Sequence, residues 1–295
     1  MFPLDYIEPV FRPPSEARSL ILQVTNGCSY NKCTFCTMYT DPQKRFKVKP
    51  ASEIESELVQ MQLYSGYIRR IFLADGDAMT LSFRRLDDIL DLINRYLPDI
   101  NRVSAYCLPR NLNNKTVEQL IELRQKGLSL VYVGAESGDD LVLQKVAKGE
   151  SYASTLAALS KLKQAGIKAS VMVLNGLGGK RYSEQHAINS ARLVSEAQPE
   201  YLSTLVLTMR DEQRFLEGFD NDYEPMSQLE LIQEMQLFLQ NCELENSIFR
   251  SDHASNHLVL KGVLGKDKEA MMQRITLALN SPNSGVLRPE WARGF

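Results

Sequence analysis

Three of the five cysteines in the chain lie within nine residues, at Cys28, Cys33 and Cys36. Thiolates at such short spacing can converge on one soft metal centre. The other candidate sulfur and imidazole ligands are distant in the sequence: Cys107, Cys242, His186, His253 and His257.

Three interpretations of this cysteine group compete. A structural zinc site normally takes four protein ligands, and buried cysteines can simply be inert. An iron–sulfur cluster held by three thiolates leaves one iron open to another molecule. The lack of a fourth cysteine or histidine nearby in the sequence favours the cluster, because a catalytic metal centre needs an open coordination position.

Short apolar, β-branched runs recur along the chain and predict strands at 19–25, 70–74, 102–106, 129–133, 167–174 and 201–207. The intervals between them carry helical periodicity and predict helices at 52–65, 82–96, 116–126, 152–165 and 183–197. Such alternation is typical of βαβ units and predicts an α/β fold with a parallel sheet. Six units fit a partial barrel or a flat, doubly wound sheet. In both, the loops after the strands form the working face.

Local signals mark several helix ends. Ser52 and Glu55 predict a capping box at the start of the first helix. Gly127 and Gly166 fall just past two helices, where a left-handed residue is favoured.

The rhythm changes after Leu207. The remaining chain predicts a polar, acidic loop, a helix, a short strand, a loop rich in Asn, Ser and His, and a last helix, at 211–224, 227–240, 247–250, 251–257 and 266–280. We therefore expect a core domain over residues 1–208 and a C-terminal extension over residues 209–295 that packs on it.

Composition narrows the classes of function. The 295 residues carry 34 Lys plus Arg against 36 Asp plus Glu, so the net charge of −2 gives no general attraction to nucleic acid or to an anionic membrane. No apolar run reaches the roughly 18–20 residues of a membrane helix. The first eight residues show no basic leader before an apolar stretch. We expect a cytoplasmic protein, in which cysteines serve as ligands or free thiols rather than disulfides.

The segment 25–36 resembles the cluster loop of the radical S-adenosylmethionine (SAM) superfamily. The resemblance implies that Cys28, Cys33 and Cys36 hold a [4Fe–4S] cluster and that Phe35 lies near the adenine of SAM. One departure is the gap of four residues between the first two cysteines, where the family most often has three. The resemblance continues to about Thr208 and implies the partial barrel rather than the flat sheet.

Three further turns resemble the family's SAM-binding segments. After the second strand, the turn 74–77, with Asp75, Gly76 and Asp77, stands where the family receives the methionyl ammonium group. After the fourth and fifth strands, further turns resemble the segments beside the ribose and the adenine; their candidate residues are Glu136, Ser137, Asn175 and Gly176. Each turn alone could be an ordinary cap or turn. Their order on successive strands behind the cysteines supports the SAM interpretation.

Two cations are candidates for the SAM carboxylate, Arg110 and Lys148. Arg110 lies with Tyr106 on a segment expected to face the cavity, and its alternatives are a substrate anion or a structural ion pair. The basic run 44–49 is a solvated edge or a docking site for an acidic electron donor or an anionic substrate. Cys107 is expected to be a buried thiol at a strand end rather than a ligand, Cys242 a structural thiol, and His186 a surface residue. His253 and His257 are expected to be structural or exposed, with substrate contact, proton transfer and metal binding as the alternatives.

The resemblance implies an enzyme that cleaves SAM reductively to a 5′-deoxyadenosyl radical, which abstracts hydrogen from a small-molecule substrate. A flavodoxin or ferredoxin would supply the electron. The branch containing oxygen-independent coproporphyrinogen oxidase-like proteins, the Elongator catalytic subunit and the methylthiotransferases is the most similar in layout. Two alternatives stay open: a non-catalytic zinc-binding or redox-sensing protein, and a haem-handling protein of the coproporphyrinogen oxidase-like type.

Overall fold

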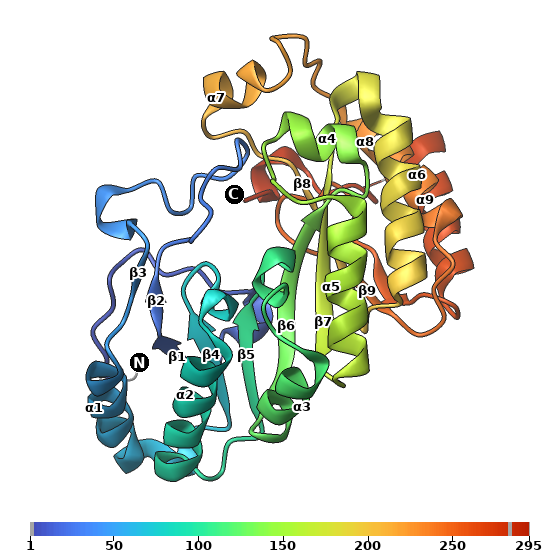
Figure 1. Cartoon of the computed structure of the whole chain (residues 1–295). Coiled ribbons are helices and arrows are strands. Elements are labelled where there is room, and N and C mark those ends of the chain that lie inside the picture. The colour runs from blue at the N-terminus through green and yellow to red at the C-terminus, as the bar shows by residue number, and fades with distance from the viewer. Residues whose placement is uncertain (1–2, 283–284, 295) are drawn as a thin grey trace. The chain divides into compact units, whose positions relative to one another are not determined.

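The computed structural model describes residues 3–282 and 285–294 and shows an α/β protein (Figure 1). Two compact units divide it. The first comprises residues 1–31, 38–133 and 158–169, and the second comprises 32–37, 134–157 and 170–295. The boundary predicted between a core domain and a C-terminal extension, at residue 208, is not one of the boundaries between these units and stays a prediction.

The first unit is built on parallel strands in the order β1 (Leu20–Gln23), β4 (Arg70–Ala74), β5 (Arg102–Tyr106) and β6 (Leu128–Glu136), whose last residues belong to the second unit. A separate antiparallel pair joins β2 (Thr25–Asn26) to β3 (Lys47–Val48). Along the strands run α1 (Ala51–Met61), α2 (Phe83–Tyr96) and α3 (Val117–Gln125), and α2 packs against both of the others (Figure 1). Short 3₁₀ turns complete the described chain at Pro14–Glu16, Pro42–Lys44, Gln62–Tyr67, Ala78–Thr80, Pro109–Leu112 and, in the second unit, Glu290–Ala292.

Local sequence explains where these helices begin. Ser82 caps α2 by accepting the Arg85 N–H at 3.3 Å, and Thr116 forms a capping box with Gln119 at the start of α3. The box predicted for Ser52 and Glu55 is wrong, because Pro50 is the N-cap and α1 starts at the next residue without a side-chain cap. The glycines predicted to end two helices have positive φ angles: Gly127 +112° and Gly166 +70°.

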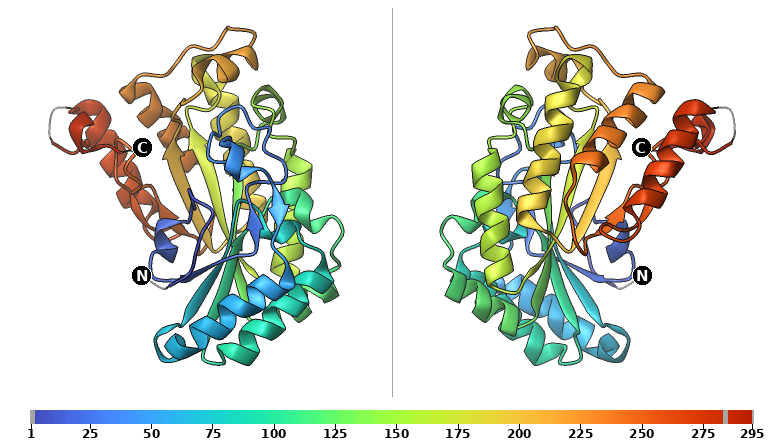
Figure 2. Two further views of the ribbon diagram at one scale, coloured as in Figure 1. Left: turned by 90° about the vertical axis from the view of Figure 1, so that its left-hand side faces the viewer. Right: turned by 90° about the vertical axis from the view of Figure 1, so that its right-hand side faces the viewer.

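The second unit carries β7 (Lys168–Asn175), β8 (Tyr201–Val206), β9 (Ile248–Arg250) and β10 (Lys261–Val263). The first three run parallel, and β10 pairs antiparallel with β9. Its helices are α4 (Asp140–Lys145), α5 (Tyr152–Gln164), α6 (Gly179–Ala197), α7 (Glu212–Glu217), α8 (Gln228–Asn241) and α9 (Lys268–Asn280), with the end of α5 counted in the first unit. Figure 2 shows α6, α8 and α9 side by side, and α8 packs against both neighbours.

Every predicted strand overlaps an observed one, whereas β3 and β10 were not predicted. The capping box at Ser227 starts α8 as its Ser/Glu spacing requires. Two short helices, α4 and α7, were not predicted, and α7 lies in the segment expected to be an acidic loop. In the described part of the chain, no helix combines the length and apolarity needed to span a membrane.

Candidate cofactor site

The turn after β4 holds two buried carboxylates beside the first cysteine. Asp77 accepts the Ser29 N–H at 3.0 Å and also the Ser29 hydroxyl. The Gly76 N–H donates to the Gly27 carbonyl at 3.1 Å. A Cβ at Gly76 would lie 3.0 Å from the Cys28 Cβ and 2.7 Å from the Tyr39 ring, so glycine lets this turn approach the cysteine closely.

Burial dominates the electrostatics of this turn. It raises the pKa of Asp75 and of Asp77 above the usual value, although the Lys44 ammonium and the Ser29 hydrogen bonds act in the opposite direction. Lys44 pairs with Asp75, and both side chains are fully buried. The expectation that the run 44–49 is one solvated edge is therefore wrong for Lys44, because this lysine has a buried anionic partner. Docking of an electron donor stays a prediction for the exposed Arg45 and Lys47.

Arg110 and Tyr106 lie in the first unit, near other aromatic residues. The Arg110 guanidinium stands over the Tyr30 ring, 3.9 Å from its centroid, two residues after Cys28. Its charge also acts on Asp77. The Tyr106 ring packs edge-to-face on Phe72 at 5.1 Å between centroids. The cofactor contacts of both residues stay predictions.

In the second unit, Glu136 and Lys148 form a buried ion pair at the end of β6. Lys148 Nζ lies 3.1 Å from Glu136 Oε1, and the two side chains are 4% and 6% exposed. The Glu136 backbone has a φ of +64°, a conformation that costs free energy in a residue with a side chain and occurs often at functional sites. Within the described residues, no group donates a hydrogen bond to Glu136 Oε2. A buried acceptor of this kind fits a hydroxyl group of a bound ligand.

Lys148 also faces the segment that carries the other two cysteines. Burial lowers the pKa of Lys148, but the charges of Glu136, Cys33 and Cys36 outweigh it, and the pKa is raised above its usual value. The Phe35 ring centroid lies 5.8 Å from Lys148 Nζ. An ammonium group beside these two thiols suits an anionic centre, and this fits the expected thiolate-bound cluster.

The turn after β7 is held by α8. The Gly176 N–H donates to Glu234 Oε1 at 2.6 Å, and Asn175 Nδ2 donates to the Leu231 carbonyl at 3.0 Å. The Tyr223 hydroxyl donates to the Gly176 carbonyl at 2.6 Å. Sequence reasoning missed Glu234. Its position among the apolar residues of α8 was the available signal, because helical periodicity places it on the buried face.

His186 is buried in α6, so the expectation of a surface residue is wrong. Nε2 lies 3.0 Å from the Leu174 carbonyl, and Nδ1 lies 2.8 Å from the Ser137 hydroxyl. The carbonyl can only accept, so Nε2 carries a proton and donates to it. His186 thereby links the ends of β6 and β7.

The two later histidines lie in a loop, as the Asn and Ser content indicates. His253 Nδ1 lies 2.9 Å from the Ser255 hydroxyl, and burial followed by the Arg288 charge lowers the pKa of His253. His257 lines a cavity of about 530 Å³ with Gln228 and Arg288. Substrate contact by these histidines stays a prediction.

Cys107 and Cys242 are buried, as expected. Burial raises the pKa of Cys242 to about 12. Across residues 3–282 and 285–294, no three side chains of His, Cys, Asp or Glu are grouped closely enough to hold a metal ion.

A family model for the radical SAM superfamily matches residues 22–194, more than half of the chain. The heme chaperone HemW of Bacillus subtilis (strain 168) is 24% identical over 168 residues, which cover 54% of this chain and 44% of that protein. The chain thus spans less than half the length of this curated relative.

Solved structures share the fold. Methylornithine synthase (PylB) has a TM-score of 0.52 at 18% identity, over 77% of this chain and 63% of that chain. The radical SAM methyltransferase TsrM from Kitasatospora setae, with cobalamin and a [4Fe–4S] cluster bound, has a TM-score of 0.52 at 18% identity, over 64% of this chain and 34% of that chain. These likenesses confirm the predicted α/β fold class of the partial-barrel type.

Proposed function

The chain belongs to the radical SAM superfamily, and we propose that it is an enzyme that uses SAM to abstract hydrogen from a small molecule. Membership brings the two expected cofactors, a [4Fe–4S] cluster and SAM. One observation carries the proposal: the buried Glu136–Lys148 pair faces Cys33 and Cys36 and keeps one carboxylate oxygen without a donor among the described residues.

In this proposal Cys28, Cys33 and Cys36 would hold the [4Fe–4S] cluster, and SAM would bind beside it. Bound together, the two cofactors supply a 5′-deoxyadenosyl radical and methionine by one-electron cleavage of the bond between sulfur and the 5′ carbon. The protein contributes position and the exclusion of water.

Residues around the two cysteine segments have separate tasks. Glu136 accepts a ribose hydroxyl on Oε2, while Lys148 holds its other oxygen and balances its charge. Gly76 and Asp77 form the turn for the methionyl ammonium group. The other proposed contacts to SAM are Phe35, Tyr106, Arg110, Ser137, Asn175 and Gly176.

We propose a small-molecule substrate because the net charge of −2 offers no general attraction to nucleic acid. The electron comes from an outside reductant such as flavodoxin or ferredoxin. A cytoplasmic location fits cysteines that act as ligands.

The deciding experiment is anaerobic reconstitution with iron and sulfide, then reduction with dithionite in the presence of SAM and chromatography for 5′-deoxyadenosine. We expect slow formation of this product, absent from the Cys28→Ala/Cys33→Ala/Cys36→Ala variant. Zinc in place of iron in protein purified without oxygen would instead support the structural or sensing alternative. A full cluster without SAM binding would support a sensor.

A second candidate function is haem handling, which the likeness to the heme chaperone HemW favours. The observation in this chain that fits it is the cavity beside His257 and Arg288, because an imidazole can ligate iron and a guanidinium can bind a carboxylate. Haem titration followed by absorption spectroscopy tests it. A His257→Ala variant with an unchanged haem spectrum would remove this residue from the site.

A further inference from the structure

Lys44 and Asp75 form an ion pair whose side chains are both 0% exposed. Taking two charges out of water costs several kcal/mol per ion, and a buried ion pair is often no more stable than an apolar pair of similar volume. Stability alone therefore does not account for this pair. Its contacts must supply the reason.

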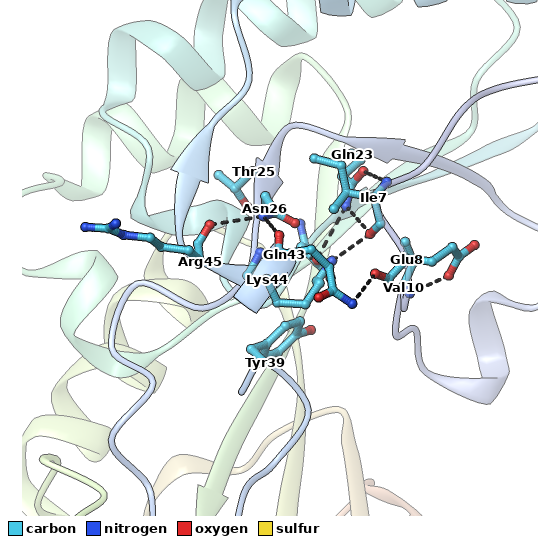
Figure 3. A network of polar contacts seen from close by, with 12 residues as sticks. Ile7, Glu8, Val10, Gln23, Thr25, Asn26, Tyr39, Gln43, Lys44 and Arg45 are labelled. Carbon is cyan, nitrogen blue, oxygen red and sulfur yellow. Dashed lines mark hydrogen bonds and ion pairs between the residues drawn. The ribbon is translucent and has the colours of Figure 1, made fainter. Parts of the chain in front are cut away.

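The pair joins four segments of the first unit. Lys44 Nζ donates to the Ile7 carbonyl at 2.8 Å as well as to Asp75, and Figure 3 shows the lysine beside Ile7 and Tyr39. Asp75 Oδ2 accepts the Gly27 N–H at 3.2 Å and lies 3.4 Å from Gln23 Nε2. Gln23 also accepts the Ile7 N–H at 3.0 Å.

Lys44 also stands at the point where the cysteine segment closes on itself. Asn26 Nδ2 donates to the carbonyls of Gln43 at 2.7 Å and Arg45 at 3.0 Å (Figure 3). A Cβ at Gly27 would lie only 1.9 Å from the Lys44 carbonyl oxygen. The chain that leaves at Gly27 thus returns to the same place at Lys44, and residues 28–43 between them carry all three clustered cysteines.

The peptide before Cys28 is held on both sides by the turn after β4. The Gly27 N–H binds Asp75, and the Gly27 carbonyl accepts the Gly76 N–H at 3.1 Å. The first of these bonds needs the Asp75 carboxyl group in a fixed position, and Lys44 is its buried ion-pair partner. The ion pair therefore sets where Cys28 begins relative to Gly76.

We propose that Lys44 is a positioning residue of the cofactor site, which acts through Asp75 and Gly27 to hold Cys28 against the SAM-binding turn. This inference rests on the proposed function, which gives the cluster to Cys28 and the SAM ammonium group to the Gly76 turn. The buried charge is retained for geometry, as buried polar groups are in other proteins that need one specific arrangement.

The test compares Lys44→Met with Lys49→Met. Lys49 belongs to the same basic run, but its partner is Glu57 and both side chains of that pair are partly exposed. Each protein is reconstituted anaerobically. The readouts are iron per chain, the electron paramagnetic resonance (EPR) spectrum of the reduced cluster with and without SAM, SAM affinity, and the melting temperature without cofactors.

We expect Lys44→Met to bind SAM about 10- to 100-fold more weakly, the range for groups that orient metal ligands. We also expect it to lose the spectral change that SAM produces. Lys49→Met should match the wild type in both. If Lys44→Met fails to fold, Lys44→Met/Asp75→Asn leaves no buried charge, and the same losses are expected of it.

Two results would overturn the inference: wild-type SAM affinity and EPR response in the folded variant, or a change confined to the melting temperature. Both leave the proposed function standing, because the wild type still takes up iron and cleaves SAM. A wild type that holds no cluster would refute the proposed function and this inference with it.

Discussion

Removal of the Glu136 carboxylate should weaken SAM binding and destabilise the second unit through two separable effects. Glu136→Gln keeps the size of the side chain but removes the carboxylate whose Oε1 lies 3.1 Å from Lys148 Nζ. Lys148 then has no ion-pair partner among the described residues. Breaking a buried ion pair by removing one partner costs about 3–5 kcal/mol. The charge-assisted bond to a ribose hydroxyl is worth roughly 1.5–3 kcal/mol, which corresponds to about a 10- to 100-fold rise in the dissociation constant for SAM.

A double variant separates the two effects. Glu136→Gln/Lys148→Met contains neither buried charge, so it should recover most of the lost stability. SAM affinity should stay low, because the carboxylate is still missing. Glu150→Gln is the matched control: this carboxylate lies two residues after Lys148 and accepts from the Ser154 hydroxyl at 2.9 Å.

The assay is SAM titration of the reconstituted protein, beside urea unfolding of the protein without cofactors. Unchanged SAM affinity in Glu136→Gln, with a loss of stability alone, would show that the carboxylate only balances Lys148. That result would remove Glu136 from the SAM site. Equal losses in Glu150→Gln would show that the effect is not specific to the pair.

Three further predictions concern the surroundings of the site. Glu234→Leu leaves the Gly176 N–H and the Ser183 hydroxyl without their acceptor, which costs roughly 1–3 kcal/mol each. Urea unfolding should therefore show a clear loss of stability, and SAM titration should show a weaker affinity. The control Gln233→Leu, on the exposed face of the same helix, should change neither the stability nor the affinity. Gly27→Ala should destabilise the protein far more than Gly166→Ala. Both glycines have a positive φ, which costs an alanine about 1–2 kcal/mol, but only at Gly27 would the added Cβ lie 1.9 Å from a carbonyl oxygen. Gly66→Ala adds its Cβ in open space and should leave the melting temperature nearly unchanged. Burial of Glu16 is outweighed by bonds from Ser19 and Tyr132 and by the Arg102 charge, so the pKa of Glu16 is lowered; its stabilising effect is present above the unfolded pKa and is lost as pH falls through the folded pKa. Melting temperatures of Glu16→Gln should therefore depend less on acid pH than those of the wild type, and parallel curves would contradict this.

Much of the fold could be predicted because its signals are local. Strand positions follow from short apolar runs, and the starts of α2, α3 and α8 follow from Ser82, Thr116 and Ser227. The first helix shows the limit of such signals. The sequence has the Ser52 and Glu55 pattern, but α1 begins before Ser52. Pro50, with its φ fixed at −57°, is the N-cap, and the helix starts at the next residue.

The site residues that sequence reasoning misplaced are all buried polar groups. Periodicity assigns a charged residue to solvent unless a partner is visible, and the partners here are distant in the chain. Lys44 meets Asp75 from another loop, and Glu234 reaches Gly176 across 58 residues. His186 was assigned to the surface because its partners are distant in the chain: Ser137 directly follows β6, and the Leu174 carbonyl belongs to β7.

In each unit, one buried charged residue that was not predicted from the sequence lies beside a turn at the end of a strand. Most buried positions of this chain are apolar, and a charged residue at a buried position lowers stability. Such departures from the pattern are expected at functional sites. Lys44 breaks the pattern at the turn of Gly76, and Glu234 breaks it at the turn of Gly176. The resemblance to the radical SAM superfamily assigns both turns to SAM contacts. Buried polar side chains from distant segments therefore fix the backbone of both turns, and the SAM contacts of these turns stay predictions.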